Sequence, residues 1–85
     1  MNEKKIVQNI ITSINKIKKI QDKKTFINSK FDFYSSGHLD SLQLIHFIIL
    51  LEKKFKINFS PKDKESKKFR YVDGLAKIIA KKLKN

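Results

Sequence analysis

Ser41 is the residue of this chain whose type and position most clearly permit chemistry, because it falls in the first turn of an expected helix. Asp40 is a good N-cap for that helix, and Gln43 three residues later resembles a capping-box partner. A serine near a helix start often does no more than satisfy backbone donors, but Asp40 already fills that role. The Ser41 hydroxyl is then free to point outward, where an attached phosphate would meet unpaired N–H groups and the positive end of the helix dipole.

The two histidines do not turn Ser41 into a hydrolytic nucleophile. His46 lies five residues further along the same helix, which is a poor approach for a base that must reach the hydroxyl. The sequence has no Gly-x-Ser-x-Gly elbow either. We therefore expect no enzymatic activity, a solvent-facing His38, and a His46 that is an exposed polar residue or a partner contact. Neither histidine has the companions of a metal site.

The helix that begins at Asp40 and runs to about Lys54 or Phe55 carries two separate apolar faces at about 100° per residue. The first is the expected core face, formed by Leu44, Phe47, Ile48, Leu51 and Phe55. The second, here called the outer stripe, consists of Leu42, Ile45 and Ile49, beside Ser41 and bordered by Glu52. The polar side carries Gln43, His46, Lys53, Lys54 and one apolar residue, Leu50.

The outer stripe needs an explanation, because a surface helix with one core face is normally polar over the rest. Three explanations are open: coverage by a long aromatic loop, a dimer seam, or a docking surface. The apolar pattern alone favours coverage by the loop. Ser41 at the edge of the stripe shifts the balance towards docking.

The segments before this helix are expected to be one helix and one loop. Isoleucine and valine recur at three- and four-residue steps, which predicts an amphipathic helix, at Ile6, Val7, Ile10, Ile11, Ile14, Ile17 and Ile20. Residues 21–39 show no sustained period and are expected to form a long loop with a turn at Ser35–Gly37. Apolar side chains should pin that loop onto the helices, namely Phe26, Ile27, Phe31, Phe33 and Tyr34.

The C-terminal part predicts two more helices. Ser60 as a cap and Pro61 at a first helical position indicate a short third helix. The last helix should begin near Tyr71, with an apolar face formed by Val72, Leu75, Ile78, Ile79 and Leu83. The expected fold class is all-α: a small four-helix bundle of three main helices plus a short third helix, with a long loop between helices one and two. Residues 1–85 are expected to form a single domain.

The chain has a formal net charge of +12 over 85 residues, which raises nucleic acid or an anionic membrane as partners. Arg70 is the only arginine, although arginine is the residue best suited to contacts with phosphate and guanine. We therefore attribute the lysines to codon bias. No apolar run is long enough to cross a bilayer, there is no signal-peptide pattern, and there is no cysteine. These observations favour the cytoplasm.

The segment "GHLDSLQLIHFIILLEKKFKINF", residues 37–59, resembles the phosphopantetheine-binding segment of acyl carrier proteins. The resemblance rests on Asp40-Ser41-Leu42, then Leu51-Glu52, then Phe55-x-Ile57 with Phe59 in an apolar position. The segment "FRYVDGLAKII", residues 69–79, is similar to the closing segment of that family. The resemblance covers the chain from about Phe31 to Leu83, and the N-terminal helix fits by position only.

This resemblance implies that Ser41, with Asp40 and Leu42 beside it, is the attachment site of a 4′-phosphopantetheine cofactor. A phosphopantetheinyl transferase would add the arm, and its thiol would hold an acyl or aminoacyl group as a thioester. Other expected partners are an activating ligase and a downstream acyltransferase or synthase. The chain is expected to be monomeric.

In the family, the second helix is the surface that partner enzymes read. The corresponding positions here are Leu42, Ile45, His46, Ile49, Glu52 and Lys53. Typical members are strongly acidic, whereas His46 and Lys53 stand where the family often has carboxylates. This departure favours a specialised pathway over bulk fatty-acid synthesis.

Two hypotheses from other functional classes remain beside the carrier hypothesis. A small basic nucleic-acid-binding protein would explain the charge but not Asp40-Ser41-Leu42, and the helix from Asp40 has no lysine before Lys53. An oligomerising bundle would use the outer stripe as its seam. No nucleic acid and no membrane insertion are expected under the carrier reading.

Overall fold

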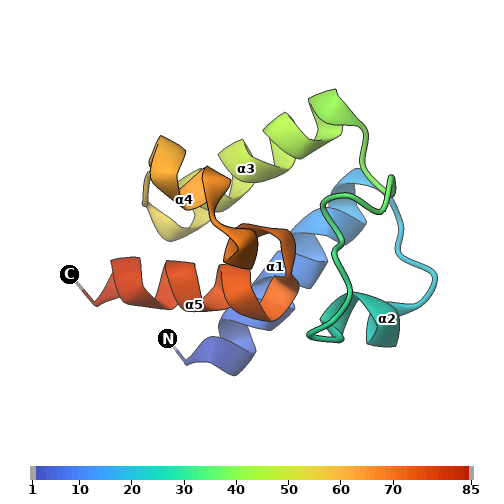
Figure 1. Ribbon diagram of the computed structural model, residues 1–85, viewed down its shortest axis with the longest axis horizontal. Coiled ribbons are helices and arrows are strands. Elements are labelled where there is room, and N and C mark those ends of the chain that lie inside the picture. The colour runs from blue at the N-terminus through green and yellow to red at the C-terminus, as the bar shows by residue number, and fades with distance from the viewer. Residues whose placement is uncertain (1, 85) are drawn as a thin grey trace.

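Residues 2–84 of the computed structural model are described here, and within them every regular element is helical. Three long helices dominate: α1 (Glu3–Ile17), α3 (Ser41–Phe55) and α5 (Val72–Leu83). Three short elements join them: α2 (Lys23–Ile27), α4 (Pro61–Glu65) and the 3₁₀ helix η1 (Lys67–Arg70). Figure 1 shows α3 running along the top of the molecule and α5 along the bottom, with α1 crossing behind. The predicted all-α class is therefore confirmed.

The core lies where α1, α3 and α5 face one another. Its fully buried side chains include Ile6, Ile10 and Ile14 from α1, Phe47 and Leu51 from α3, and Val72, Leu75 and Ile79 from α5. These are the periodic apolar positions of each helix, and their burial is the main force that holds such helices together. The predicted core face of α3 is confirmed, with Leu44 only partly buried against the cluster.

Helix α1 is shorter than its apolar pattern suggests. It ends at Ile17, and Ile20 is buried from the loop beyond the helix. The Asn15 side chain explains the turn, because its Oδ1 accepts a hydrogen bond from the Ile20 N–H at 2.8 Å. The chain can therefore leave the helix and still return an apolar side chain to the core.

The prediction of an irregular segment over residues 21–39 is wrong at one place, because this segment contains α2. Asp22 caps this short helix through Thr25, whose N–H and hydroxyl both donate to its carboxylate. Five residues are too few to show an apolar period, so the pattern could not reveal the helix. The expected pinning holds for Phe26 and Phe33, which are buried, but not for Ile27, which is 48% exposed.

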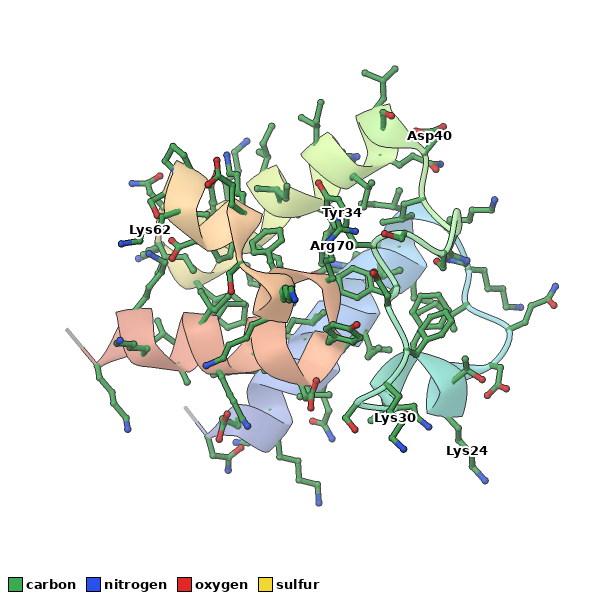
Figure 2. All side chains as sticks on the ribbon, in the orientation of Figure 1. Lys24, Lys30, Tyr34, Asp40, Lys62 and Arg70 are labelled. Carbon is green, nitrogen blue, oxygen red and sulfur yellow. The ribbon has the colours of Figure 1, made fainter. Side chains whose placement is uncertain are left out.

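Arg70 fastens the loop before α3 onto the C-terminal part of the chain. Its guanidinium lies 3.5 Å from the Asp32 carboxylate, donates to the Ser35 hydroxyl, and sits 5.5 Å from the centre of the Tyr34 ring. Figure 2 shows Tyr34 and Arg70 meeting near the middle of the molecule. The Tyr34 ring also packs edge-on against Phe69. Arg70 therefore contacts the loop at a carboxylate, at a hydroxyl and at an aromatic ring.

The start of α4 is fixed by a capping box between Ser60 and Asp63, with Pro61 at the first turn, as predicted. Asp63 also forms an ion pair with Lys82 of α5, with 2.7 Å between Oδ2 and Nζ. Burial alone would raise the pKa of Asp63, but hydrogen bonds from Lys82 and Ser60 hold that pKa below its ordinary value. The pair joins α4 to α5 across the surface.

Gly74 permits the close approach of η1 to α5. A Cβ at this position would lie 2.4 Å from the Lys68 carbonyl oxygen, which is backbone and has little freedom to move. Glycine in a helix interior normally costs stability, so its use here reflects this contact.

Within residues 2–84, no helix is both long enough and apolar enough to cross a membrane.

Candidate functional site

Ser41 is the first residue of α3, directly after a complete capping box. Asp40 Oδ1 accepts from the Gln43 N–H at 2.8 Å, and Gln43 Oε1 accepts from the Asp40 N–H at 2.9 Å. Ser41 is exposed, and its hydroxyl forms no hydrogen bond with residues 2–84. Both sequence expectations hold: Asp40 does the capping, and the Ser41 hydroxyl is left uncommitted. Figure 2 shows Asp40 at the outer end of α3, away from the other helices.

The loop before Ser41 is held firmly on its inner side. Leu39 is buried immediately before the cap, and Gly37 takes a φ of +85° that other residues rarely adopt. His38 contradicts the expectation of a solvent-facing side chain. Its Nε2 lies 2.9 Å from the Lys18 carbonyl oxygen, and its ring packs edge-on against Phe26. His38 therefore ties the loop to the end of α1 and is not available to Ser41 as a base.

The outer stripe is open to solvent along its whole length. Leu42 is 78% exposed, Ile45 55% and Ile49 43%. The aromatic loop does not cover it, because Phe26, Phe33 and Leu39 turn into the core instead. Loop coverage, which the apolar pattern alone favoured, is thus wrong, and the alternatives left are a seam between copies and a docking surface.

The polar residues expected at this surface differ in their availability. His46 and Lys53 are exposed. Glu52 is partly buried, and its Oε2 accepts a hydrogen bond from the Phe59 N–H at 2.9 Å. That bond anchors the loop between α3 and α4 and lets Phe59 reach the core. Its partner is seven residues away across a turn, so no helical periodicity pointed to it.

A shallow hollow of about 330 Å³ lies at the C-terminal end of the outer stripe. Ile49 and Ile57 contribute apolar lining, and the charged lining consists of Lys53, Lys56 and Glu52. Lys56 ends α3 in the left-handed conformation, with φ 56°, and Ile57 follows on the turn. No sequence pattern predicts the hollow, because its position depends on the direction in which the chain leaves α3.

Another surface groove, of about 790 Å³, lies away from Ser41, between α4, η1 and α5. Its lining includes Lys62, Lys68, Lys77 and Lys81, together with Glu65 and the Asp63–Lys82 pair. No aromatic side chain lines it, so it has no platform on which a nucleic-acid base could stack.

In the part of the chain that the structure describes, no three His, Cys, Asp or Glu side chains are grouped as metal ligands would be.

No family model matches this chain, and no curated protein or solved structure shows significant similarity to it. Its function must therefore be argued from its own residues.

Proposed function

We propose that this chain is an acyl or aminoacyl carrier protein whose Ser41 bears a 4′-phosphopantetheine arm. The Ser41 oxygen would attack the pantetheine-bearing phosphorus of coenzyme A, and the bond from that phosphorus to the adenosine bisphosphate portion would break. The hydroxyl proton would pass to a base of the transferase, because Asp40 caps α3 and the His38 ring is held at the Lys18 carbonyl. The thiol of the arm would then hold the cargo as a thioester, since the chain has no cysteine.

The observation that carries this proposal is that the capping of α3 does not use the Ser41 hydroxyl. Asp40 and Gln43 satisfy the helix start reciprocally, so the exposed Ser41 hydroxyl has no structural task. A phosphodiester on Ser41 would lie in the favourable field of the α3 N-terminus. The exposed outer stripe begins at the next residue, Leu42, and offers a partner enzyme an apolar surface beside the arm.

The finer fold assignment belongs to the same proposal. We assign α1, α3 and α5 to the three main helices of a four-helix carrier bundle, and α4 to its short third helix. The loop pinned by Arg70 would be the long connection between the first two main helices. The proposed partners are a phosphopantetheinyl transferase, an activating ligase and a downstream acyltransferase or synthase of a specialised pathway.

Intact-mass analysis tests the proposal directly. Wild-type protein is incubated with coenzyme A, Mg²⁺ and a broad-specificity phosphopantetheinyl transferase. A gain of one phosphopantetheine, located on Ser41 by fragmentation and missing in Ser41→Ala, is the expected result. An unmodified wild-type chain with several transferases, each active on a control carrier, would overturn it.

The lysine-lined groove between α4 and α5 favours a second candidate, a small nucleic-acid-binding protein. Several lysines line this groove. Its helices α4 and α5 lie mainly at the left of Figure 1, whereas α3 begins at the upper right. Binding through such groups must fall steeply as salt rises. Titration of labelled single- and double-stranded DNA and RNA at low salt decides: no binding removes this candidate.

A further inference from the structure

The exposed side of α3 changes character along its length. Ser41 and the exposed Leu42 lie at its N-terminal end, and Lys53 lies about 18 Å from Ser41 along the axis. The outer stripe leads from one end to the other and finishes in the hollow beside Ile57. The surface is thus an apolar ridge that starts at the modification site and ends between Lys53 and Lys56.

The two carboxylates near this surface, Asp40 and Glu52, each accept a hydrogen bond from a backbone N–H group. Asp40 caps α3, and Glu52 holds the Phe59 N–H. Lys53 and Lys56 take part in neither of the two ion pairs found among residues 2–84. Around the hollow, the exposed Lys53 and Lys56 outnumber the partly buried Glu52, so the local charge is positive, on a chain whose net charge is +12. Such a field attracts acidic surfaces and repels basic ones.

We propose that this surface docks an acidic amphipathic helix of a partner enzyme. Apolar side chains of that helix would lie on Leu42, Ile45 and Ile49, one of them in the hollow beside Ile57. Its carboxylates would meet Lys53 and Lys56, which fixes the direction of docking relative to Ser41. The inference rests on the proposed function, since it names the kind of enzyme surface that reads the carrier.

The surface fits this occupant better than it fits a second copy of the chain. Each copy carries a net charge of +12, so two copies repel one another. A stable interface buries roughly 1,200–2,000 Å² in total, and four aliphatic side chains are too few to supply that area. Helices that lie on membranes typically present aromatic residues as well, whereas the large apolar side chains exposed on α3 are all aliphatic. A short, directional contact with an acidic helix suits the small apolar area.

The test uses three synthetic peptides and the full-length chain. The first peptide is an amphipathic helix with a leucine ridge flanked by glutamates, the second has the same composition in scrambled order, and the third replaces the glutamates with lysines. Binding is followed by the shifts of backbone amide resonances in ¹⁵N-labelled protein. Two double variants are compared: Lys53→Glu with Lys56→Glu at the proposed site, and Lys77→Glu with Lys81→Glu on α5. Both change the net charge equally.

The expected result is that only the first peptide binds, with shifts concentrated from Leu42 to Ile57. The Lys53/Lys56 variant should weaken it by about tenfold, and the Lys77/Lys81 variant by less than about twofold. Equal binding of the scrambled peptide, equal effects of the two variants, shifts centred on α5, or no binding would each overturn the inference. All variants are first checked for wild-type amide dispersion.

Ser41→Ala separates this inference from the proposed function. It should bind the first peptide like the wild type, because Ser41 lies at the edge of the stripe. If Ser41 is modified but no peptide binds at α3, the docking inference fails and the carrier function stands. If the peptide binds but Ser41 is never modified, the carrier function fails and the surface remains an acidic-helix binding site.

Discussion

Arg70 and Asp32 lie 38 residues apart in the sequence, yet the Nη1 of Arg70 is 3.5 Å from the Oδ2 of Asp32. Asp32 in turn accepts the Ser35 N–H through its other oxygen at 2.9 Å. The contact joins η1, the element before α5, to the loop that leads to Ser41. The C-terminal part of the chain therefore helps to fix the approach to Ser41.

Arg70→Met should lower the free energy of unfolding by about 1 kcal/mol, because it removes the partly exposed ion pair and the contact with the Tyr34 ring. Arg70→Lys should be more stable than Arg70→Met but less stable than the wild type. A lysine ammonium is not planar and cannot contact Asp32, Ser35 and the Tyr34 ring at once, as the guanidinium does. Urea denaturation followed by circular dichroism measures both variants. Full recovery by lysine would mean that charge alone matters.

Ser41→Ala should change the free energy of unfolding by less than about 0.5 kcal/mol, because the serine hydroxyl has no partner among residues 2–84 and alanine favours helices. Asp40→Ala should cost about 1 kcal/mol through loss of the cap. Denaturant melts of the two neighbours provide the comparison. A large loss in Ser41→Ala would assign the serine a structural task and weaken the carrier proposal.

Gly74→Ala should destabilise the protein although alanine is the better helix former. The new methyl would lie 2.4 Å from the Lys68 carbonyl oxygen, and overpacking of this kind typically costs about 1–3 kcal/mol. Gly37→Ala is the matched control, because open space surrounds Gly37 and only its φ of +85° opposes a side chain. Thermal unfolding should rank Gly74→Ala as the more damaging change. The reverse order would argue against close packing of η1 on α5.

Gln substitutions along the outer stripe should leave the fold and the mass of the particle unchanged. Leu42, Ile45 and Ile49 are exposed, so their exchange removes little burial. Ile48→Ala, from the core face of the same helix, should cost about 2–4 kcal/mol. Light scattering and denaturant melts test both statements. A smaller particle after the stripe substitutions would support the oligomerising alternative.

Acid should remove part of the stability through Asp63. Its pKa is lowered in the folded chain, so its contribution is complete above the unfolded value of about 3.9 and disappears as pH falls through the lower folded value. For a surface ion pair with Lys82, the expected size is about 0.5 kcal/mol. Asp63→Asn should therefore lie below the wild type at pH 7 and approach it near pH 2 in parallel urea melts. A constant gap across this range would contradict the assignment.

Local patterns predicted the parts of this structure that depend on neighbours in the sequence. The Asp40–Gln43 box, the Ser60–Pro61 start and the core face of α3 follow from spacings of one helical turn, and all three are observed. Contacts across long separations had no such signal. The Arg70–Asp32 pair and the His38–Lys18 bond depend on how the chain folds back, and α2 is too short to have a period.

The candidate site was likewise predicted only where it depends on neighbouring residues in the sequence. Helical angles separated the outer stripe from the core face correctly, but they could not tell whether the loop would cover the stripe. Only the inward orientation of Phe33 and Leu39 decides that. The angles also placed Glu52 at the border of the stripe, but they could not predict that its carboxylate accepts a hydrogen bond from the Phe59 N–H.

The two-sided character of α3 has a consequence for how such a protein can evolve. Residues that hold the fold, such as Phe47 and Leu51, and residues that meet solvent, such as Ile45 and Ile49, alternate on one helix without sharing positions. Substitutions at the outer positions can therefore alter the exposed surface of α3 at little thermodynamic cost. If that surface docks a partner as proposed, a gene duplicate could acquire a new partner through two or three codons and keep the same scaffold.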